Sequence, residues 1–271
     1  MEKNSNDDLK ISQNLGRIKH KIIVLSGKGG VGKSTVSVNL AFALSEKKYM
    51  VGLMDCDMHG PSIPKILGVE EKKPTPSLKG FHPIMVTPNL KVMSIGFLLS
   101  DTDSPIIWRG PMKMGAIKQF IGDVEWGDLD YLIVDLPPGT GDEPLSIAQL
   151  IPKSDGAVIV TTPQDLALVS VRKSINFVKK MNMPVIGIIE NMSGFTCPHC
   201  QKEIDIFKTG GGLKASQDLQ VPFLGKIPLD PNIVTTGDSG EPFLTKHASA
   251  KASKAFITIV EKIEQIVNQR R

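Results

Sequence analysis

The sequence predicts a doubly wound α/β fold, in which helices cover both faces of a mainly parallel sheet. Short apolar runs rich in β-branched residues alternate with longer helical patterns, and this alternation is typical of βαβ units. The first apolar run leads into a glycine-rich loop and then into a helical pattern, the order expected of a phosphate-binding loop. Strands are expected over 22–25, 51–54, 92–95, 131–134, 157–161, 185–189 and 223–225, and helices over 35–46, 112–120, 167–181, 212–219 and 249–269.

Composition favours one globular domain. The 271 residues are 41% apolar and 22% charged, with a net charge of +4 that is spread along the chain, so no nucleic-acid or membrane partner is indicated. Residues 1–20 are polar with no apolar stretch and are expected to form a tail rather than a secretory signal. No run of about 18 apolar residues occurs, so we expect no membrane-spanning helix. We expect a soluble, cytoplasmic protein with a single ATPase domain over 21–271.

The glycine-rich loop predicts a nucleoside triphosphate site. Its glycines let successive N–H groups converge on phosphate, and the helix that begins near Gly32 directs its positive end at the same anion. Lys33 is expected to reach the β- and γ-phosphates, Ser34 to ligate Mg²⁺ and Thr35 to donate to the α-phosphate. The expected ATP-binding residues of the loop are Gly27, Lys28, Gly29, Gly30, Val31, Gly32, Lys33, Ser34 and Thr35.

A second lysine, Lys28, stands near the start of this loop. The spacing Lys-Gly-Gly-x-Gly-Lys-Ser resembles the variant loop of the group that contains MinD, ParA, the arsenical-pump ATPase and the nitrogenase iron protein. The resemblance implies that Lys28 crosses a homodimer interface to the partner's phosphates, as a catalytic charge comparable to an arginine finger. The alternative is a solvated lysine on a mobile loop.

Carboxylates follow two predicted strands. Asp55 and Asp57 come directly after one strand and Asp135 ends another, and strand ends of a parallel sheet meet at one edge. Asp135 is expected near Mg²⁺, and the segment that follows it can sense the γ-phosphate. The resemblance assigns the orientation of the attacking water to Asp57 and leaves Asp55 near Mg²⁺ or its waters. The alternative is that Asp55 and Asp57 cap the turn at residues 60–61.

Asn191 follows the expected strand over 185–189. An Asn side chain offers a donor and an acceptor that together suit the N6 and N7 edge of adenine, and the resemblance implies this contact, with residues 227–230 closing the base pocket. The alternative is an Asn that caps a loop.

The helix expected over 249–269 has apolar residues at helical spacing: Phe256, Val260, Ile263 and Val267. It could lie on a membrane surface, as in MinD, or pack against the core. Its polar face mixes acidic and basic side chains, which favours a packed core helix.

Cys197 and Cys200 form a Cys-x-x-Cys pair. A tetrahedral zinc or a four-iron cluster takes four ligands, so one chain supplies half a site and a two-fold dimer supplies the rest. Three interpretations compete: an exchangeable iron–sulfur cluster, a structural zinc, and disulfide redox chemistry, which normally needs the motif at the start of a helix. Cys56 is expected to be a buried thiol, and His199 to be exposed or hydrogen-bonded to a ligand.

Five motifs together resemble the Mrp/ApbC iron–sulfur carrier ATPases, and the likeness extends from about residue 21 onward. They are the phosphate loop, Asp55-x-Asp57-x-x-Gly60-Pro61-Ser62-Ile63-Pro64, Trp108-Arg109-Gly110-Pro111, Asp135-x-Pro137-Pro138-Gly139-Thr140-Gly141-Asp142, and Cys197-x-x-Cys200. The resemblance implies slow ATP hydrolysis and a labile 4Fe–4S cluster between two protomers. The cluster would come from cluster-assembly machinery and pass to apo iron–sulfur proteins.

Two other classes remain as alternatives. A positioning ATPase like MinD or ParA would have a membrane or DNA partner, but the cysteine pair and the lack of a mainly basic terminal helix argue against it. A small-molecule kinase would use the same phosphate loop, yet the sequence has no recognisable acceptor pocket.

Overall fold

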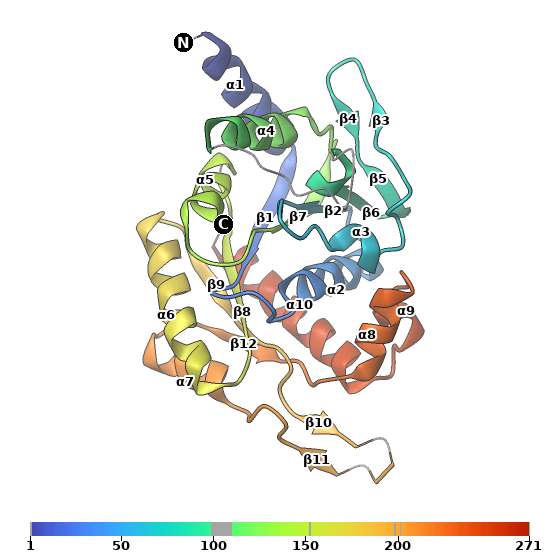
Figure 1. Ribbon diagram of the computed structural model, residues 1–271, viewed down its shortest axis with the longest axis vertical. Helices are drawn as coiled ribbons and strands as arrows, with labels where there is room; N and C mark the ends of the chain where they lie inside the picture. Colours follow the sequence, from blue (N-terminus) through green and yellow to red (C-terminus); the bar gives the residue numbers. More distant parts are fainter. Residues whose placement is uncertain (1, 99–109, 152, 198, 201, 271) are drawn as a thin grey trace.

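A mixed sheet forms the centre of the molecule (Figure 1). The computed structural model describes residues 2–98, 110–151, 153–197, 199–200 and 202–270, and within these ranges the sheet has eight strands in the order β12-β9-β8-β1-β7-β2-β6-β5. All neighbours run parallel except β5 and β6. The strands are β1 (Ile18–Leu25), β2 (Val51–Asp55), β5 (Ile84–Thr87), β6 (Leu90–Ser94), β7 (Leu129–Asp135), β8 (Gly156–Thr161), β9 (Val185–Glu190) and β12 (Phe223–Lys226).

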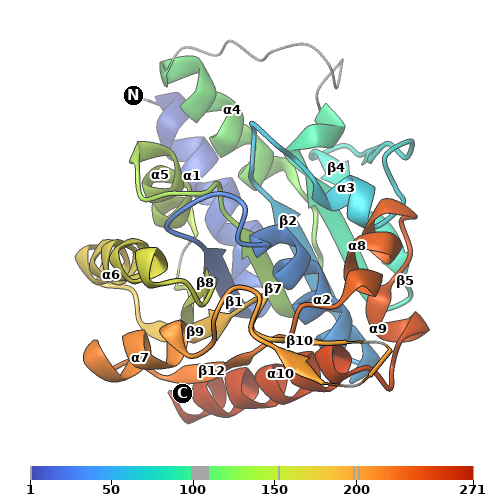
Figure 2. The same ribbon diagram turned by 60° about the horizontal axis from the view of Figure 1, so that its bottom comes forward.

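Helices cover both faces of the sheet (Figure 2), which confirms the predicted doubly wound class. One face carries α2 (Lys33–Glu46) and α10 (Lys251–Gln269), with α3 (Ile63–Ile66), α8 (Pro231–Asp238) and α9 (Phe243–Lys246) beside α2. The other face carries α1 (Glu2–Gly16), α4 (Gly110–Asp123), α5 (Asp142–Leu150), α6 (Asp165–Lys180) and α7 (Gly211–Asp218). A 3₁₀ turn over Ile95–Leu98 follows β6.

The predicted strands all form, and most extend one or more residues further than the apolar pattern indicated. Strand β1 begins four residues earlier than expected, at Ile18, because its first half pairs with β7 through polar residues such as His20 and Lys21. The antiparallel edge strand β5 and the helices α3, α5, α8 and α9 were not predicted. They are short, and Pro or Gly interrupts the local pattern.

Two small ladders lie outside the central sheet. Strands β3 (Thr75–Pro76) and β4 (Phe81–His82) form one, and β10 (Phe195–Thr196) and β11 (Glu203–Ile204) form the other. The β10–β11 hairpin carries the cysteine pair and projects from the body of the molecule (Figure 1). The Trp108-Arg109 part of the motifs lies outside the described residues.

The C-terminal helix α10 is a packed core helix, as predicted. Phe256, Val260, Ile263 and Val267 are each at most 2% exposed, and the helix lies against α2, β9 and β12. A helix whose apolar face is covered in this way has no such face to place on a membrane surface. No helix within the described ranges is long and apolar enough to cross a bilayer.

The expectation of a polar tail over residues 1–20 is wrong, because this segment forms α1 and the first part of β1. Ile11 and Leu15, four residues apart, are 3% and 0% exposed. Helix α1 packs against α4, where Asn14 Nδ2 donates to the Gly122 carbonyl oxygen over 2.5 Å. Most residues of α1 are polar, and two buried apolar residues do not make a helical pattern that the sequence alone reveals. The helix was therefore not predicted.

We expect α1 to stabilise the domain that was predicted to begin at residue 21. Leu15→Ala should lower the free energy of unfolding by about 2–5 kcal/mol, because it removes a fully buried side chain from a packed site. Leu9→Ala, on the same helix but 56% exposed, should change it by at most about 0.5 kcal/mol. Urea unfolding followed by circular dichroism measures both. Equal effects in the two variants would mean that α1 does not belong to the folded unit.

Candidate functional site

The phosphate loop runs from the end of β1 to the start of α2, as the sequence predicted. Gly30 and Gly32 have φ angles of +74° and +77°, in the left-handed region that favours glycine. A side chain on Gly32 would also meet the Asn191 amide, since its Cβ would lie 2.4 Å from Nδ2. The loop therefore needs glycine here both for its backbone angles and for close approach.

The loop encloses a cavity of about 190 Å³ at the amino-terminal end of α2, and this helix end attracts anions. No side chain caps α2, which leaves the first N–H groups of the helix directed toward the cavity. Residues from the loop, the segment after β2 and the segment after β7 line it: Ser26, Gly29, Gly30, Val31, Gly32, Lys33, Ser34, Asp57, Gly60, Ser62 and Pro138.

A buried ion pair joins this loop to β7. Lys33 Nζ lies 2.6 Å from Asp135 Oδ2, and Ser34 Oγ donates to the same oxygen over 2.7 Å. Ser37 Oγ, one turn further along α2, donates to Asp135 Oδ1 over 2.6 Å. The structure thus brings together the three residues predicted for phosphate and Mg²⁺, while their roles toward these ligands stay predictions. A hydroxyl and a carboxylate are the oxygen ligands that Mg²⁺ prefers.

Asp55 and Asp57 have different surroundings. Asp55 lies beside Asp135 on the neighbouring strand and is fully buried, where it accepts hydrogen bonds from Ser94 Oγ and the Asp57 backbone N–H over 2.8 and 3.1 Å. Burial, with the Asp135 charge adding to it, raises the pKa of Asp55 to about 7. A divalent cation beside Asp55 would lower that pKa again.

Asp57, in contrast, lines the phosphate cavity and is 8% exposed. Its Oδ1 accepts hydrogen bonds from the backbone N–H groups of His59 and Gly60, each over 3.2 Å. These bonds fix the orientation of the carboxylate at the edge of the cavity. Asp57 therefore makes the turn contacts that the alternative interpretation proposed while it lines the cavity, and its role toward an attacking water stays a prediction.

Lys28 points away from the cavity of its own chain. Its Nζ donates to Gln164 Oε1 over 3.3 Å, on the loop between β8 and α6. Gly27, just before it, packs against α6, and a Cβ there would come within 2.4 Å of the Ser170 carbonyl oxygen. Lys28 is thus partly buried and hydrogen-bonded within its own chain, and its action toward a partner chain stays a prediction.

Asn191 contacts the loop rather than the cavity. It follows β9, is 7% exposed, and its Nδ2 donates to the Val31 carbonyl oxygen over 2.9 Å. The predicted contact between Asn191 and adenine stays a prediction.

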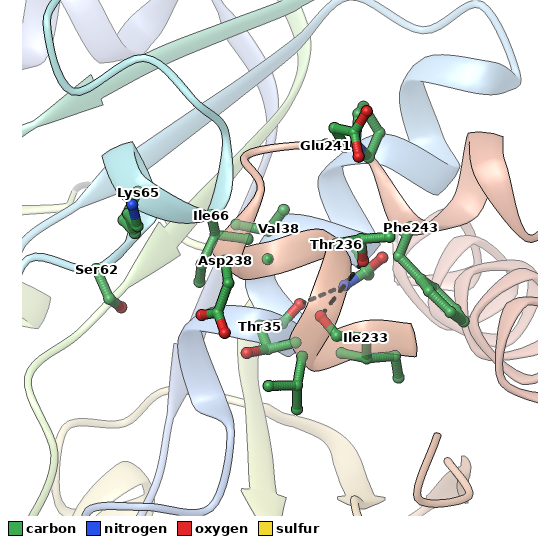
Figure 3. A pocket seen from close by; sticks show the side chains of 14 residues that line it. Thr35, Val38, Ser62, Lys65, Ile66, Ile233, Thr236, Asp238, Glu241 and Phe243 are labelled. Carbon is green, nitrogen blue, oxygen red and sulfur yellow. Dashed lines mark hydrogen bonds between the residues drawn. The ribbon is translucent and has the colours of Figure 1, made fainter. Parts of the chain in front are cut away.

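A second cavity, of about 280 Å³, lies between α2, α3, α8 and α9 (Figure 3). Thr35 lines it from the start of α2, Ile233 and Asp238 line it from α8, and Ser62 lines both cavities. Thr35 thus lines the second cavity and not the first, and its contact with an α-phosphate stays a prediction. Helix α8 begins at residue 231, directly after the segment 227–230 that was predicted to close the base pocket.

The cysteine pair lies at the tip of the β10–β11 hairpin. Cys197 is partly buried and Cys200 is exposed, and the Cys197 backbone N–H donates to the Lys202 carbonyl oxygen over 2.9 Å. Backbone N–H groups of Cys200 and His199 lower the pKa of the Cys197 thiol, and the Cys200 side chain adds to this. The thiolate, which this lowered pKa favours, is the form that binds metals.

Within the described ranges, no three His, Cys, Asp or Glu side chains lie close enough to hold a metal ion. The pair therefore stands as two potential ligands in one chain. Cys56 is buried beside the phosphate site, as expected. The redox interpretation loses support because Cys197 and Cys200 lie between β10 and β11, and among the described residues neither cysteine begins a helix.

Sequence reasoning missed several residues that contact the site. Ser37 lies four positions after Lys33 and so on the same side of α2, a signal that was present. Ser94 is the last residue of β6 and Gln164 follows the end of β8, so the strand-end rule could have found both. The same rule could have found Glu190, a charged residue directly after the expected strand over 185–189, whose buried carboxylate accepts hydrogen bonds from Ser193 Oγ and the Gly210 N–H.

Comparison with known proteins agrees with this geometry. The family model described as ParA, NUBPL iron-transfer P-loop NTPase, matches residues 17–264. The iron–sulfur cluster carrier protein of Methanocaldococcus jannaschii is 54% identical over 264 residues, 97% of this chain and 90% of the relative. That of Saccharolobus solfataricus is 50% identical, over 97% of this chain and 89% of the relative.

Solved structures show the same fold. A nucleotide-binding protein from Archaeoglobus fulgidus, solved in complex with ADP, has a TM-score of 0.77 and 40% identity, over 87% of this chain and 92% of that one. The cell division ATPase MinD of Pyrococcus furiosus has a TM-score of 0.65 and 23% identity, over 92% of this chain and 99% of that one. At that identity MinD supports the fold alone. The relatives from Methanocaldococcus jannaschii and Saccharolobus solfataricus confirm the resemblance to the Mrp/ApbC carriers. Because the family model matches nearly the whole length of the chain, the chain belongs to the NUBPL iron-transfer P-loop NTPases.

Proposed function

We propose that two copies of this chain hold a labile 4Fe–4S cluster between their cysteine pairs and use slow ATP hydrolysis to deliver it to apoproteins. The observation that carries this proposal is the position of Cys197 and Cys200 at the tip of a projecting hairpin. A 4Fe–4S cluster takes four thiolates, and two symmetry-related hairpins supply four. The printed names of the relatives, iron–sulfur cluster carrier proteins, support the cargo.

The exposed position of the pair suits a cargo that must be passed on. An exposed cluster is reached by the thiolates of a recipient without unfolding of the carrier, whereas a structural zinc is normally enclosed by its four ligands. The donor would be cluster-assembly machinery and the recipients apo iron–sulfur proteins.

ATP would place its triphosphate in the cavity of the phosphate loop and its nucleoside toward the second cavity. The ADP complex of the Archaeoglobus fulgidus protein supports nucleotide binding by this kind of chain. Ser34 lines the first cavity, the adjacent Thr35 lines the second and Ser62 lines both, which supports a nucleotide that extends from one cavity to the other. Asn191 and the segment before α8 would then approach the base.

Hydrolysis would use charges and orientation supplied by this chain. Asp57 orients the water that attacks the γ-phosphorus, the bond to the β–γ bridging oxygen breaks, and ADP and phosphate leave with a proton released to solvent. Lys33 leaves its contact with Asp135 in part to stabilise the β- and γ-phosphates. Mg²⁺, held by Ser34 and through water by Asp135 and Asp55, would neutralise charge on the same phosphates. Lys28 serves the partner's phosphates.

Anaerobic reconstitution tests the cargo. Wild-type protein with ferrous iron, sulfide and reductant should retain about two irons per chain, from four irons shared by two chains, with the visible absorption of a 4Fe–4S cluster. Cys197→Ser/Cys200→Ser should retain none, while Cys56→Ser, the matched variant of the buried thiol, should match wild type. Zinc instead of iron in freshly purified protein, or equal iron in the double variant, would overturn the proposal.

Asp57→Asn tests the position of the attacking water. The amide keeps an oxygen for the His59 and Gly60 N–H groups but loses the charge, so ATP should still bind with a dissociation constant within about twofold of wild type. Hydrolysis should fall by about 10²-fold or more, as expected for loss of such a group. Phosphate release and equilibrium ATP binding measure the two effects. A variant that no longer binds ATP would show that Asp57 acts in the turn alone.

Lys28→Ala tests the trans-acting charge. Hydrolysis should fall by at least about tenfold, because charges of this kind contribute large factors to phosphoryl transfer. Gln164→Ala, which removes only the contact within the chain, should keep most of the activity. Mixing Lys28→Ala with Lys33→Ala chains should restore about a quarter of wild-type activity, since half of the dimers regain one complete site. An inactive mixture would place the action of Lys28 within its own chain.

A further inference from the structure

The base of the cysteine hairpin is held by one buried carboxylate, that of Glu190. Glu190 ends β9 and is 0% exposed. Its Oε1 accepts hydrogen bonds from Ser193 Oγ and from the Gly210 backbone N–H, the latter over 2.9 Å, and its Oε2 accepts one from the Gly212 N–H. Ser193 precedes the hairpin and Gly210 follows it. The Glu190 side chain is therefore hydrogen-bonded to both ends of the segment that carries Cys197 and Cys200.

These bonds resist separation for a physical reason. Hydrogen bonds to a carboxylate are about twice as strong as those between neutral groups, and a buried carboxylate that loses its donors pays a large desolvation cost. The Gly210 and Gly212 N–H groups also belong to the amino-terminal end of α7, whose dipole favours negative charge. Both ends of the hairpin should therefore move together with the end of β9.

The incoming end of the hairpin is also tied to the segment after β12. The Ser193 N–H donates to the Ile227 carbonyl oxygen over 2.9 Å, and the Leu229 N–H donates to the Gly194 carbonyl oxygen over 2.8 Å. Phe195 forms a bridge with Leu229. The hairpin thus starts from a fixed anchor, although its tip projects from the body (Figure 1).

One neighbour of this anchor contacts the phosphate loop directly, and the other reaches it through the β8–α6 loop. Asn191, next to Glu190 in the chain, donates to the Val31 carbonyl oxygen. Gly211, between the two N–H groups that Glu190 binds, packs so closely against the β8–α6 loop that a Cβ would lie 2.2 Å from the Pro163 carbonyl oxygen. The next residue, Gln164, accepts the hydrogen bond from Lys28. A change in the phosphate loop therefore reaches the hairpin base from two sides.

We propose that Glu190 is a positioning residue that couples the nucleotide state of the phosphate loop to the geometry of the cysteine hairpin. The inference rests on the proposed function, because it assumes that this chain binds ATP and uses Cys197 and Cys200 for cargo. Binding of phosphate repositions the backbone around Val31 and draws Lys28 from Gln164. Asn191 and the β8–α6 loop follow, and the carboxylate of Glu190 carries this displacement to both ends of the hairpin.

The test measures the thiols directly, in the full-length chain without iron. Alkylation of Cys197 and Cys200 by iodoacetamide is followed by mass spectrometry with and without saturating ATP and Mg²⁺. In wild type, nucleotide should change the alkylation rate by about fivefold or more, the lower end of ordinary coupling between two sites. In Glu190→Gln, which keeps shape but loses the charge, the ratio should approach one while the dissociation constant of ATP stays within about twofold of wild type.

Glu264→Gln is the matched control. Glu264 is also a buried carboxylate, 7% exposed, but it lies on α10 and pairs with Lys47, so its variant should keep the full wild-type response. If Glu190→Gln does not fold, Ser193→Ala removes one donor and keeps the charge, and its response should fall by about half or more. Ser253→Ala, at an equally buried serine on α10, is its control.

A full response in Glu190→Gln, or in Ser193→Ala where that variant is used, would overturn the inference. So would wild-type thiols that do not respond to ATP. These outcomes are separate from failure of the proposed function, because cargo is measured by iron retention and this coupling by thiol reactivity without iron. Protein that retains a cluster yet has unresponsive thiols would refute the role of Glu190 alone.

Discussion

The ion pair between Lys33 and Asp135 is the interaction on which the candidate site depends. It joins the phosphate loop to β7 across 2.6 Å in the interior of the molecule, where an unpartnered charge is costly. Ser34 and Ser37 complete the hydrogen bonds of the same carboxylate, so the first turn of α2 is oriented by β7. Under the proposed function, a γ-phosphate would compete with Asp135 for the Lys33 ammonium group, so that the segment after β7 would respond to the nucleotide.

Sheet topology explains why so many polar groups converge on that pair. Strands β2 and β7 are parallel neighbours in a register that places Asp55 beside Asp135, and β1 on the other side of β7 delivers the phosphate loop at the same edge. Burial is the main cause of the raised pKa of Asp55, and the neighbouring Asp135 carboxylate adds to it, because two carboxylates so close in the interior cannot easily both be ionised. The parallel arrangement therefore places Lys33, Asp55 and Asp135 at one edge of the sheet. A negatively charged phosphate group would be attracted by the lysine, and a cation by the two carboxylates.

The sequence predicted the central strands, the phosphate loop and the cysteine pair because each depends on local patterns. Apolar runs determine buried strands, and glycine spacing determines the loop. It failed for α1, whose burial depends on Ile11 and Leu15 meeting α4, more than ninety residues away. Gln164 and Glu190 lie at strand ends, a signal that was present, but their partners, Lys28 and the two ends of the hairpin, are distant in the sequence and were not predicted. A single sequence does not show which residues far apart in the chain contact each other in the fold.

The hairpin that bears Cys197 and Cys200 has only two paired residues in each strand. Ladders of that length contribute little stability of their own, so this segment belongs to the parts of a protein that open with a small free energy while the sheet stays intact. Its opening is therefore energetically separate from global unfolding. Substitutions in this hairpin should therefore cost the nucleotide fold little stability, so that the segment around the two cysteines can diverge while the fold is kept.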